Sequence, residues 1–260
     1  MKLLLVILFF VGAVINAQSG NTLTAKFVKR SFSGDTTKIN YRFFQPQDFD
    51  AGKIYPLVLT LHGAGERGDD NESQIKYHKL ATIWAEPFVQ ADNPCFVVSP
   101  QCPKNNKWVD INWGSPTVDQ DTVPLSNELE TVMKLLDEII KNYPIDKNRI
   151  YITGLSMGGF GTWDLITRFP NIFAAAIPMS GSGNPKKVES IKQIPIWVFH
   201  GTLDKAVPVD GSRIMVDALR KANGNVIYTE YKDKGYPVWT ESYSNPLLID
   251  WLFAQRKTNN

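Results

Sequence analysis

An apolar run followed by a glycine-flanked serine constrains this chain more than any other stretch. Residues 150–153 read Ile-Tyr-Ile-Thr, which is typical of a buried strand, and residues 154–158 read Gly-Leu-Ser-Met-Gly. A helical pattern follows from Gly159 to Arg168. Strand, G-x-S-x-G turn and helix together form a nucleophile elbow, which exposes a serine hydroxyl beside a helix N-terminus that favours negative charge. The pattern predicts that Ser156 is a nucleophile, and the alternative is a plain glycine-rich turn.

Apolar runs alternate with helical patterns along the rest of the chain, which favours a mostly parallel sheet with helices on both faces. Strands are expected at residues 56–61, 95–100, 150–153, 173–179, 194–199 and 226–231. Helices are expected from Ser126 to the stop at Pro144 and over residues 159–168, 210–222 and 246–255. The fold class is therefore predicted to be α/β.

The start of the sheet is expected to differ from the rest. Residues 22–32 and 37–45 alternate in polarity and are separated by Ser33-Gly34-Asp35, which predicts an antiparallel hairpin. The chain has 260 residues and contains neither internal repeats nor a linker-like segment, so one domain over residues 22–257 is expected. The chain has 28 basic and 26 acidic residues and no basic stripe, so nucleic acid is not expected as a partner.

The first 17 residues are predicted to be a signal peptide rather than part of the fold. Met1-Lys2 is a short positive start, residues 3–14 are apolar, and Ala17 offers a small residue before a cut. The apolar run is short for a membrane span, although an uncleaved anchor is the alternative. We expect a secreted or periplasmic protein with no stable membrane insertion after cleavage.

The two cysteines are expected to be free thiols. Cys95 and Cys102 flank an extended run, and a disulfide between them would require the chain to fold back sharply. Neither cysteine has a partner at zinc-like spacing. We expect no metal and no organic cofactor.

Polar groups at the ends of other predicted strands complete a candidate site, because active groups in such sheets collect at the carboxyl ends of the strands. The backbone N–H groups of Ala64, in the turn after residues 56–61, and of Met157 are candidate oxyanion donors. Asp204 follows residues 194–199 and suits the acid that orients an imidazole. Asp210 and Asp233 are the rival acids.

The base that such a site needs is missing from its expected place. The loop after the last strand, residues 235–239, reads Gly-Tyr-Pro-Val-Trp and contains no histidine. The three histidines of the chain, His62, His78 and His200, all precede Asp204. His200 and His78 are the candidate substitutes.

These motifs together resemble a known family. The matching pieces are LHGAGERG at 61–68, CFVVSPQCP at 95–103, GLSMGGFGTW at 154–163, FHGTLD at 199–204 and LLIDWLF at 247–253. The chain is similar over residues 24–256 to secreted single-domain α/β-hydrolases related to polyhydroxybutyrate depolymerases, to feruloyl and acetylxylan esterases and to predicted peptidases of the prolyl-oligopeptidase clan.

The resemblance implies residue roles and one departure. It implies that Ser156 is the nucleophile, Asp204 the acid, and Ala64 and Met157 the oxyanion donors. The base belongs in a G-H-x-x-W motif, where this chain has Tyr236 in place of histidine.

The tyrosine changes the expected activity. A neutral phenol with an ordinary pKa near 10 is a poor base at pH 7, and loss of a triad member costs roughly 10⁴–10⁶ in rate. We expect a serine hydrolase that cleaves small-molecule or polymeric carboxylic esters, namely polysaccharide acyl, aryl or short polyester bonds, with impaired activity. The alternative is an inactive pseudo-hydrolase that binds a glycan, lipid or protein. Trp113 and Trp239 are candidate cleft residues.

Overall fold

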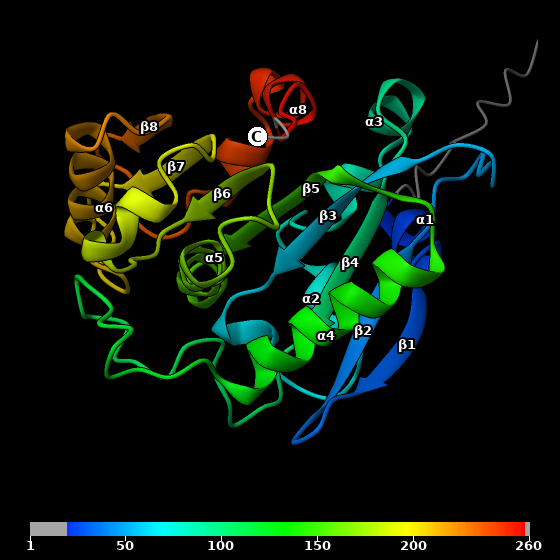
Figure 1. The fold of residues 1–260 in the computed structure, drawn as a ribbon, viewed down its shortest axis with the longest axis horizontal. Helices are drawn as coiled ribbons and strands as arrows, with labels where there is room; N and C mark the ends of the chain where they lie inside the picture. Colours follow the sequence, from blue (N-terminus) through cyan, green and yellow to red (C-terminus); the bar gives the residue numbers. More distant parts are fainter. Residues whose placement is uncertain (1–19, 258–260) are drawn as a thin grey trace, which may run out of the picture.

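The computed structural model describes residues 20–257, so the expected signal peptide, residues 1–17, lies outside the described part. Within it, one sheet has the strand order β1-β2-β4-β3-β5-β6-β7-β8 (Figure 1). The strands are β1 Val28–Ser33, β2 Lys38–Phe44, β3 Tyr55–Leu61, β4 Phe96–Gln101, β5 Ile145–Leu155, β6 Ala175–Met179, β7 Ile196–Gly201 and β8 Val226–Tyr231. Neighbouring strands from β4 to β8 are parallel, whereas β1–β2 and β2–β4 are antiparallel. The predicted mostly parallel α/β sheet with an antiparallel hairpin is confirmed.

The first strand begins later than expected. Residues 20–25 form a short helix, α1 (Gly20–Ala25), and the pairing with β2 starts only at Val28. Leu23 of this helix packs against the hydrophobic cluster beneath it, so local packing overrides the alternating pattern of residues 22–27. The expectation of a strand over 22–32 is therefore wrong for its first six residues.

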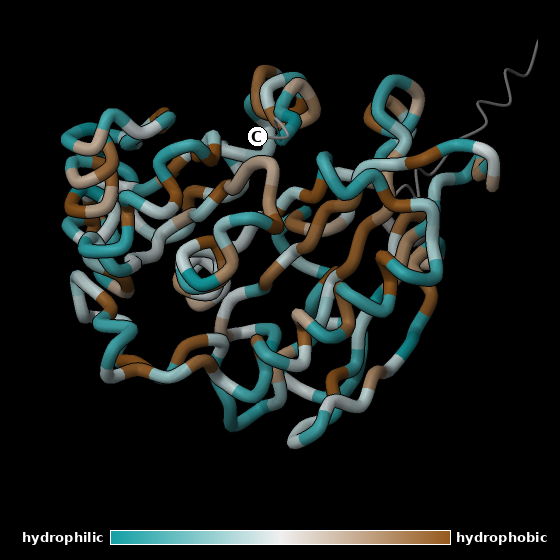
Figure 2. The backbone as a smooth tube through the Cα atoms, viewed as in Figure 1, coloured by the Kyte–Doolittle hydropathy of each residue, from teal (hydrophilic) through white to brown (hydrophobic). Residues whose placement is uncertain are grey.

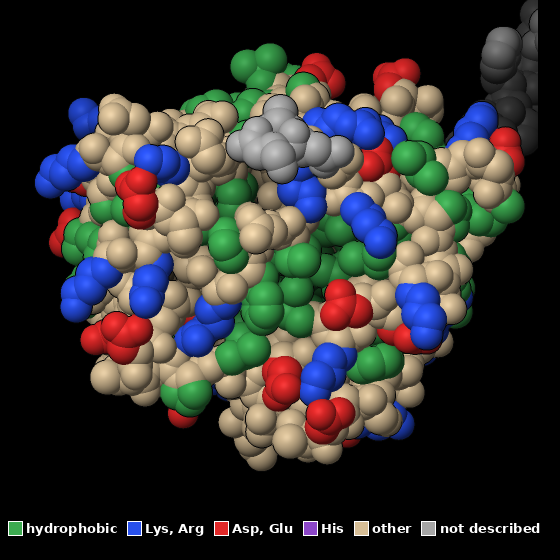
Figure 3. All heavy atoms as spheres, viewed as in Figure 1, with side chains coloured by type: hydrophobic (Ala, Val, Ile, Leu, Met, Phe, Trp, Pro, Cys, Tyr) green, Lys and Arg blue, Asp and Glu red, His purple; other side chains and the backbone are tan. Residues whose placement is uncertain are grey.

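Three long helices cover one face of the sheet. They are α4 Asn127–Asn142, α5 Met157–Arg168 and α6 Asp210–Lys221. Their buried residues share one cluster with inward-facing residues of the strands. Ser126 caps the N-terminus of α4, because its hydroxyl accepts a hydrogen bond from the Leu129 N–H at 3.1 Å. Figure 3 shows hydrophobic side chains gathered in a hollow between α4 and α5.

Shorter helices cover the other face. They are α2 Ser73–Lys76, α3 Pro87–Asp92, α7 Trp239–Tyr243 and α8 Pro246–Phe253, with the 3₁₀ turns η1 Ala64–Glu66 and η2 Thr82–Ala85 nearby and η3 Pro185–Ser190 beside α6. Trp84, Tyr243 and Leu252 belong to the cluster on this side. Figure 1 shows α3 and α8 standing apart above the sheet. Within residues 20–257 no helix has the length and apolarity that a membrane crossing requires.

The central strands are buried on both faces. All seven residues of β3 and all six of β4 are buried, and Figure 2 shows the hydrophobic residues concentrated along them. Cys95 and Cys102, at the two ends of β4, are buried and unbonded, as expected. Leu61 pairs with Gly154, so β3 and β5 end side by side. The chain leaves β3 toward one side of the sheet and β5 toward the other, which is where binding crevices form.

Candidate active site

The turn after β5 holds Ser156 in a conformation that few residues adopt. Its backbone has φ 53° and ψ −119°, and its N–H donates to the Met179 carbonyl at 2.9 Å. A Cβ on Gly158 would lie 1.8 Å from a carbonyl oxygen of β3, and a Cβ on Gly154 would lie 2.2 Å from the Gly158 carbonyl oxygen. Only glycine fits at either position, so the two glycines make the sharp turn possible. The turn places Ser156 at the end of β5, beside Gly63 of the loop after β3.

Two backbone N–H groups are available beside the serine. Met157 is the first residue of α5, and Ala64 is the first residue of η1. Within residues 20–257 neither N–H donates a hydrogen bond to another backbone group. The N-terminus of α5 adds a favourable field for negative charge at this point. The pair suits an oxyanion hole.

Polar contacts that are partly or fully buried hold the loop that carries Ala64. Arg67 Nε donates to the Ala64 carbonyl at 2.9 Å, and its Nη1 donates to the Asn106 carbonyl at 3.2 Å. Gln101 donates to the Glu66 carbonyl at 3.0 Å. A donor that is fixed before the reaction costs no reorganisation when charge develops, so these anchors favour catalysis.

His62 is a structural residue of this loop. Its Nε2 accepts the Cys102 N–H at 2.9 Å, so Nδ1 carries the proton and donates to the Gly63 carbonyl at 2.6 Å. Burial lowers the pKa of His62 to about 4. Both nitrogens are used, and the imidazole stays neutral at pH 7.

Asp204 follows β7 and has one carboxylate oxygen without a partner. Its Oδ1 accepts the N–H groups of Ala206 and Val207, both at 2.9 Å. Its Oδ2 is buried and, among the described residues, accepts no hydrogen bond. Burial favours the neutral acid, but the neighbouring His200 and the two backbone N–H groups outweigh it, so the pKa of Asp204 lies below its ordinary value. The carboxylate is thus ionised, with one oxygen ready for a further donor.

His200 does not serve as the base for Ser156. Its Nε2 lies 3.4 Å from Asp204 Oδ2 but donates to the Val207 carbonyl at 2.9 Å. Its Nδ1 lies 2.8 Å from the hydroxyl of Ser212, and the side chain is fully buried. With both nitrogens engaged, the imidazole has no lone pair free for the Ser156 proton, and it instead braces the loop that carries Asp204.

Tyr236, in the loop after β8, lies near Ser156. Burial raises the pKa of Tyr236, a hydrogen bond with Ser156 opposes the rise, and the charges of Glu66 and Asp204 add to it. The net effect is an elevated pKa, so the phenol keeps its proton at pH 7. A protonated phenol beside the serine hydroxyl is not a base that can activate it.

The two candidate cleft tryptophans differ in exposure. Trp239 begins α7, is buried, and meets the Tyr236 ring edge to face with centroids 4.6 Å apart. Trp113 is half-buried, with Arg67 and Lys107 over its ring at 5.6 and 5.8 Å. Trp239 therefore shapes the wall behind Tyr236, whereas Trp113 borders the loop that carries Ala64.

Glu66, which the sequence motifs did not single out, pairs with His78, one of the two candidate substitutes for the base. Glu66 is buried, and its Oε1 lies 3.2 Å from His78 Nε2. The His78 ring packs against Trp239 with centroids 5.0 Å apart. The available sequence signal was an acidic residue in the glycine-rich loop that follows the apolar run at residues 56–61, because a carboxylate that the fold buries requires partners.

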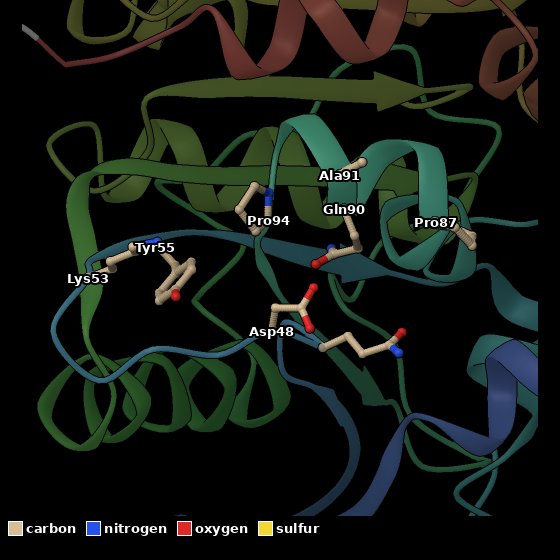
Figure 4. Close-up of a pocket in the computed structure, with 8 residues that line it drawn as sticks. Asp48, Lys53, Tyr55, Pro87, Gln90, Ala91 and Pro94 are labelled. Atoms are coloured by element: carbon tan, nitrogen blue, oxygen red, sulfur yellow. The ribbon is translucent and has the colours of Figure 1, made fainter.

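The cavities of the molecule include two outside this site. One of about 370 Å³ lies at the amino end of β3, where Figure 4 shows Gln90 of α3 and Asp48 facing one another near Tyr55. Another of about 440 Å³ lies between α3 and α8. Ser156 is at the opposite end of the sheet from the first, roughly one strand length or about 20 Å away.

A mostly parallel sheet, a sharp strand–turn–helix at Ser156 and an aspartate, Asp204, after the strand two places along are the features of the α/β-hydrolase fold. Residues 50–245 match the family model described as phospholipase/carboxylesterase, and the chain belongs to that family. The predicted fold class is confirmed.

Known esterases are similar to this chain. It is 29% identical over 149 residues to a bifunctional acetylxylan esterase/xylanase of Neocallimastix patriciarum, covering 57% of this chain and 19% of that protein. It is 28% identical over 175 residues to poly(3-hydroxyalkanoate) depolymerase C of Paucimonas lemoignei, covering 67% and 39%. A solved thermostable esterase is 43% identical, with a TM-score of 0.84, 90% of this chain covered and 64% of that one. The chain thus spans less than two thirds of each of these proteins.

Proposed function

We propose that this protein is an exported serine hydrolase that cleaves carboxylic esters. Ser156 attacks the ester carbonyl carbon and forms an acyl-enzyme, while the Ala64 and Met157 N–H groups bind the developing oxyanion. The observation that carries the proposal is the strained elbow, φ 53° at Ser156, at the head of α5. Strain of this kind costs about 1–3 kcal/mol and persists where the surroundings fix it, typically at functional sites.

The proposed substrates are acyl or aryl esters of polysaccharides and short polyesters, as small molecules or polymers. The names of two relatives, an acetylxylan esterase and a polyhydroxyalkanoate depolymerase, support these classes. Esters are favoured over amides because amide cleavage depends more on protonation of the leaving group, which a site without the usual imidazole performs poorly.

We propose that the activity is impaired relative to a complete triad. Tyr236 stands at the position where the base is expected, and its pKa is raised, chiefly by burial. Asp204 Oδ2 has no donor among the described residues. The acid and the nucleophile are therefore arranged for an imidazole that the loop after β8 does not supply.

The raised pKa of Tyr236 and the unpartnered Oδ2 of Asp204 among the described residues also favour a second candidate function. A pseudo-hydrolase would retain the elbow and bind a glycan, lipid or protein without turnover. The retained serine and oxyanion donors are more readily explained by catalysis, which is why hydrolysis is the first proposal.

Export is part of the proposal and rests on the sequence. Residues 1–17 act as a signal peptide, residues 22–257 form the hydrolase domain, and the mature chain is secreted or periplasmic without stable membrane insertion. Fractionation of cells that express the full chain tests this, and retention of an uncleaved chain in the membrane fraction contradicts it. The proposed chemistry uses no metal or organic cofactor and no nucleic acid.

Turnover of p-nitrophenyl acetate and butyrate tests the main proposal. The mature chain is expected to hydrolyse them, Ser156→Ala to lose this activity, and Ser190→Ala, an exposed serine in η3, to keep it. A fluorophosphonate is expected to label the wild type and not Ser156→Ala. Absence of Ser156-dependent turnover and labelling would support the pseudo-hydrolase.

A further inference from the structure

Arg67, in the loop after β3, has a guanidinium whose donors are only partly used. The side chain is half-buried, its Nε donates to the Ala64 carbonyl at 2.9 Å, and its Nη1 donates to the Asn106 carbonyl at 3.2 Å. A guanidinium carries five N–H donors in a fixed fork. Among the described residues Nη2 has no acceptor, and it is not one of the enclosed atoms without a partner, so it opens to solvent. Arg67 therefore has donors free for a ligand.

The positive charge of Arg67 also lacks a carboxylate partner. Arg67 takes part in none of the ion pairs formed within residues 20–257. The adjacent acid, Glu66, instead contacts His78 at 3.2 Å, and the His78 ring packs against Trp239. A cation that is partly removed from water and has no counter-charge is a favourable place for an anion.

An aromatic ring holds this guanidinium in place. Arg67 Cζ lies 5.6 Å from the centroid of the Trp113 ring, and Lys107 Nζ lies 5.8 Å from it. Lys107 is already paired with Asp110 at 3.2 Å, so Arg67 is the unpaired cation of the two. The contact with the indole and the two carbonyl acceptors restrict the guanidinium before a ligand arrives. A donor group fixed in this way loses little entropy on binding.

The strand order places Arg67 and the acid of the site on opposite sides of Ser156. Ser156 follows β5, whereas Arg67 follows β3 and reaches Asn106 in the loop after β4. Asp204 follows β7, on the other side of β5, and its carboxylate is ionised because its pKa lies below the ordinary value. A negatively charged substrate group is therefore attracted toward Arg67 and repelled by Asp204, which fixes the direction of the ester in the site.

Ala64 connects Arg67 to the proposed chemistry. Arg67 Nε binds the carbonyl of Ala64, and the N–H of the same residue is the proposed oxyanion donor. One residue, the guanidinium and the hydrogen bonds at its ends therefore separate a ligand on Nη2 from the reacting carbonyl, a span of roughly 6–12 Å. The half-ester of a dicarboxylic acid, or an aryl ester with a carboxylate on its ring, has its two groups at about this separation.

We propose that Arg67 binds a carboxylate carried by the ester substrate, an inference that rests on the proposed hydrolase function. Nη2 and the free N–H of Nη1 donate to the carboxylate oxygens, an arrangement that the planar guanidinium matches better than an ammonium does. The carboxylate belongs either to the acyl part or to the alcohol part of the ester. The chemistry that recognises it is the same in both cases.

Matched pairs of esters test the proposal through kcat/KM. Mono-p-nitrophenyl adipate against p-nitrophenyl hexanoate places the carboxylate in the acyl part, and para-carboxyphenyl acetate against para-carbamoylphenyl acetate places it in the alcohol part. Arg67→Gln is expected to lower the ratio of acidic to neutral ester about 10-fold in at least one pair, the low end for a hydrogen bond to a charged group because water screens a half-buried site. Comparison of this ratio between wild type and variant cancels the intrinsic reactivities of the esters.

Two further variants and added salt separate the contact from general effects of charge. Arg67→Lys is expected to keep part of the preference, because it retains the charge without the fork. Lys104→Gln, which removes a positive charge from an exposed position after β4, is expected to leave the ratio unchanged. Added salt is expected to weaken the preference of the wild type. Arg67 also anchors Ala64, so Arg67→Gln is expected to slow the neutral esters too; an equal fall for both members of both pairs would overturn the carboxylate contact.

Binding without turnover distinguishes this proposal from the proposed hydrolysis. In isothermal titration, Ser156→Ala is expected to bind mono-p-nitrophenyl adipate more tightly than p-nitrophenyl hexanoate, and Arg67→Gln in the same background is expected to remove the difference. If the wild type shows no Ser156-dependent turnover but this difference is found, hydrolysis is refuted and the carboxylate site stands. If neutral esters are turned over but Arg67→Gln changes neither the kcat/KM ratios nor the difference in binding, the carboxylate site is refuted and hydrolysis stands.

Discussion

Replacing Tyr236 with histidine is expected to rebuild a triad. Asp204 Oδ2 is buried, ionised and, among the described residues, without a donor. An imidazole in the loop after β8 would donate one N–H to that oxygen and direct its other nitrogen at Ser156, where the phenol now lies. Histidine is smaller than tyrosine, so the change introduces no overpacking.

The size of the effect follows from what is gained and lost. A positioned general base contributes about 10²–10⁴ in rate, or about 3–5 kcal/mol of activation free energy. The edge-to-face contact between Tyr236 and Trp239 is worth about 0.5–1.5 kcal/mol, so the melting temperature is expected to fall by about 1–6 °C. The variant should therefore remain folded and become faster.

Steady-state kinetics with p-nitrophenyl butyrate measure the gain. We expect Tyr236→His to raise kcat/KM by at least 10²-fold. Asp204→Asn in that background should remove most of the gain, because an amide selects the wrong imidazole tautomer. In the wild type, where Asp204 orients no base, the same substitution should cost far less. The proposed geometry of this site would be refuted by a folded Tyr236→His protein whose kcat/KM does not rise. A rise that Asp204→Asn does not reduce would refute it as well.

Two further outcomes concern stability. Gly158→Ala is expected to prevent soluble expression, because the added Cβ would lie 1.8 Å from a carbonyl oxygen. Gly65→Ala is the control, since its added Cβ meets nothing within 4 Å and the variant should fold. A soluble Gly158→Ala protein with wild-type urea stability would contradict the packing of the elbow. Hydrogen bonds from Arg213 hold the pKa of Glu230 down at about 2. This pair should therefore stabilise the fold above about pH 4.5 and lose its effect as the pH falls toward 2. The urea midpoints of wild type and Arg213→Gln should differ at pH 6 and converge near pH 2.

Local patterns predicted much of the fold because they act within a few residues. The helix after Ser126, the elbow at residues 154–158 and the strand after Val226 match the structure, since caps, glycines and β-branched runs set backbone preferences locally. Residues 22–27 did not follow their alternation, because the packing of Leu23 decided their conformation. The strand β5 begins at Ile145, five residues earlier than its apolar run, because pairing with Tyr55 extends it.

The sequence by itself determined the place of Ser156, the proposed nucleophile, the glycines around it and the absence of histidine from the loop after β8. Only the tertiary structure decided which lone pairs are free. His62 and His200 are committed to backbone and hydroxyl partners, whereas His78 is paired with Glu66 beside the wall that Trp239 forms. These partners come from segments far apart in the chain, and a proton can move only between atoms that the folded backbone brings into contact, which no local pattern specifies.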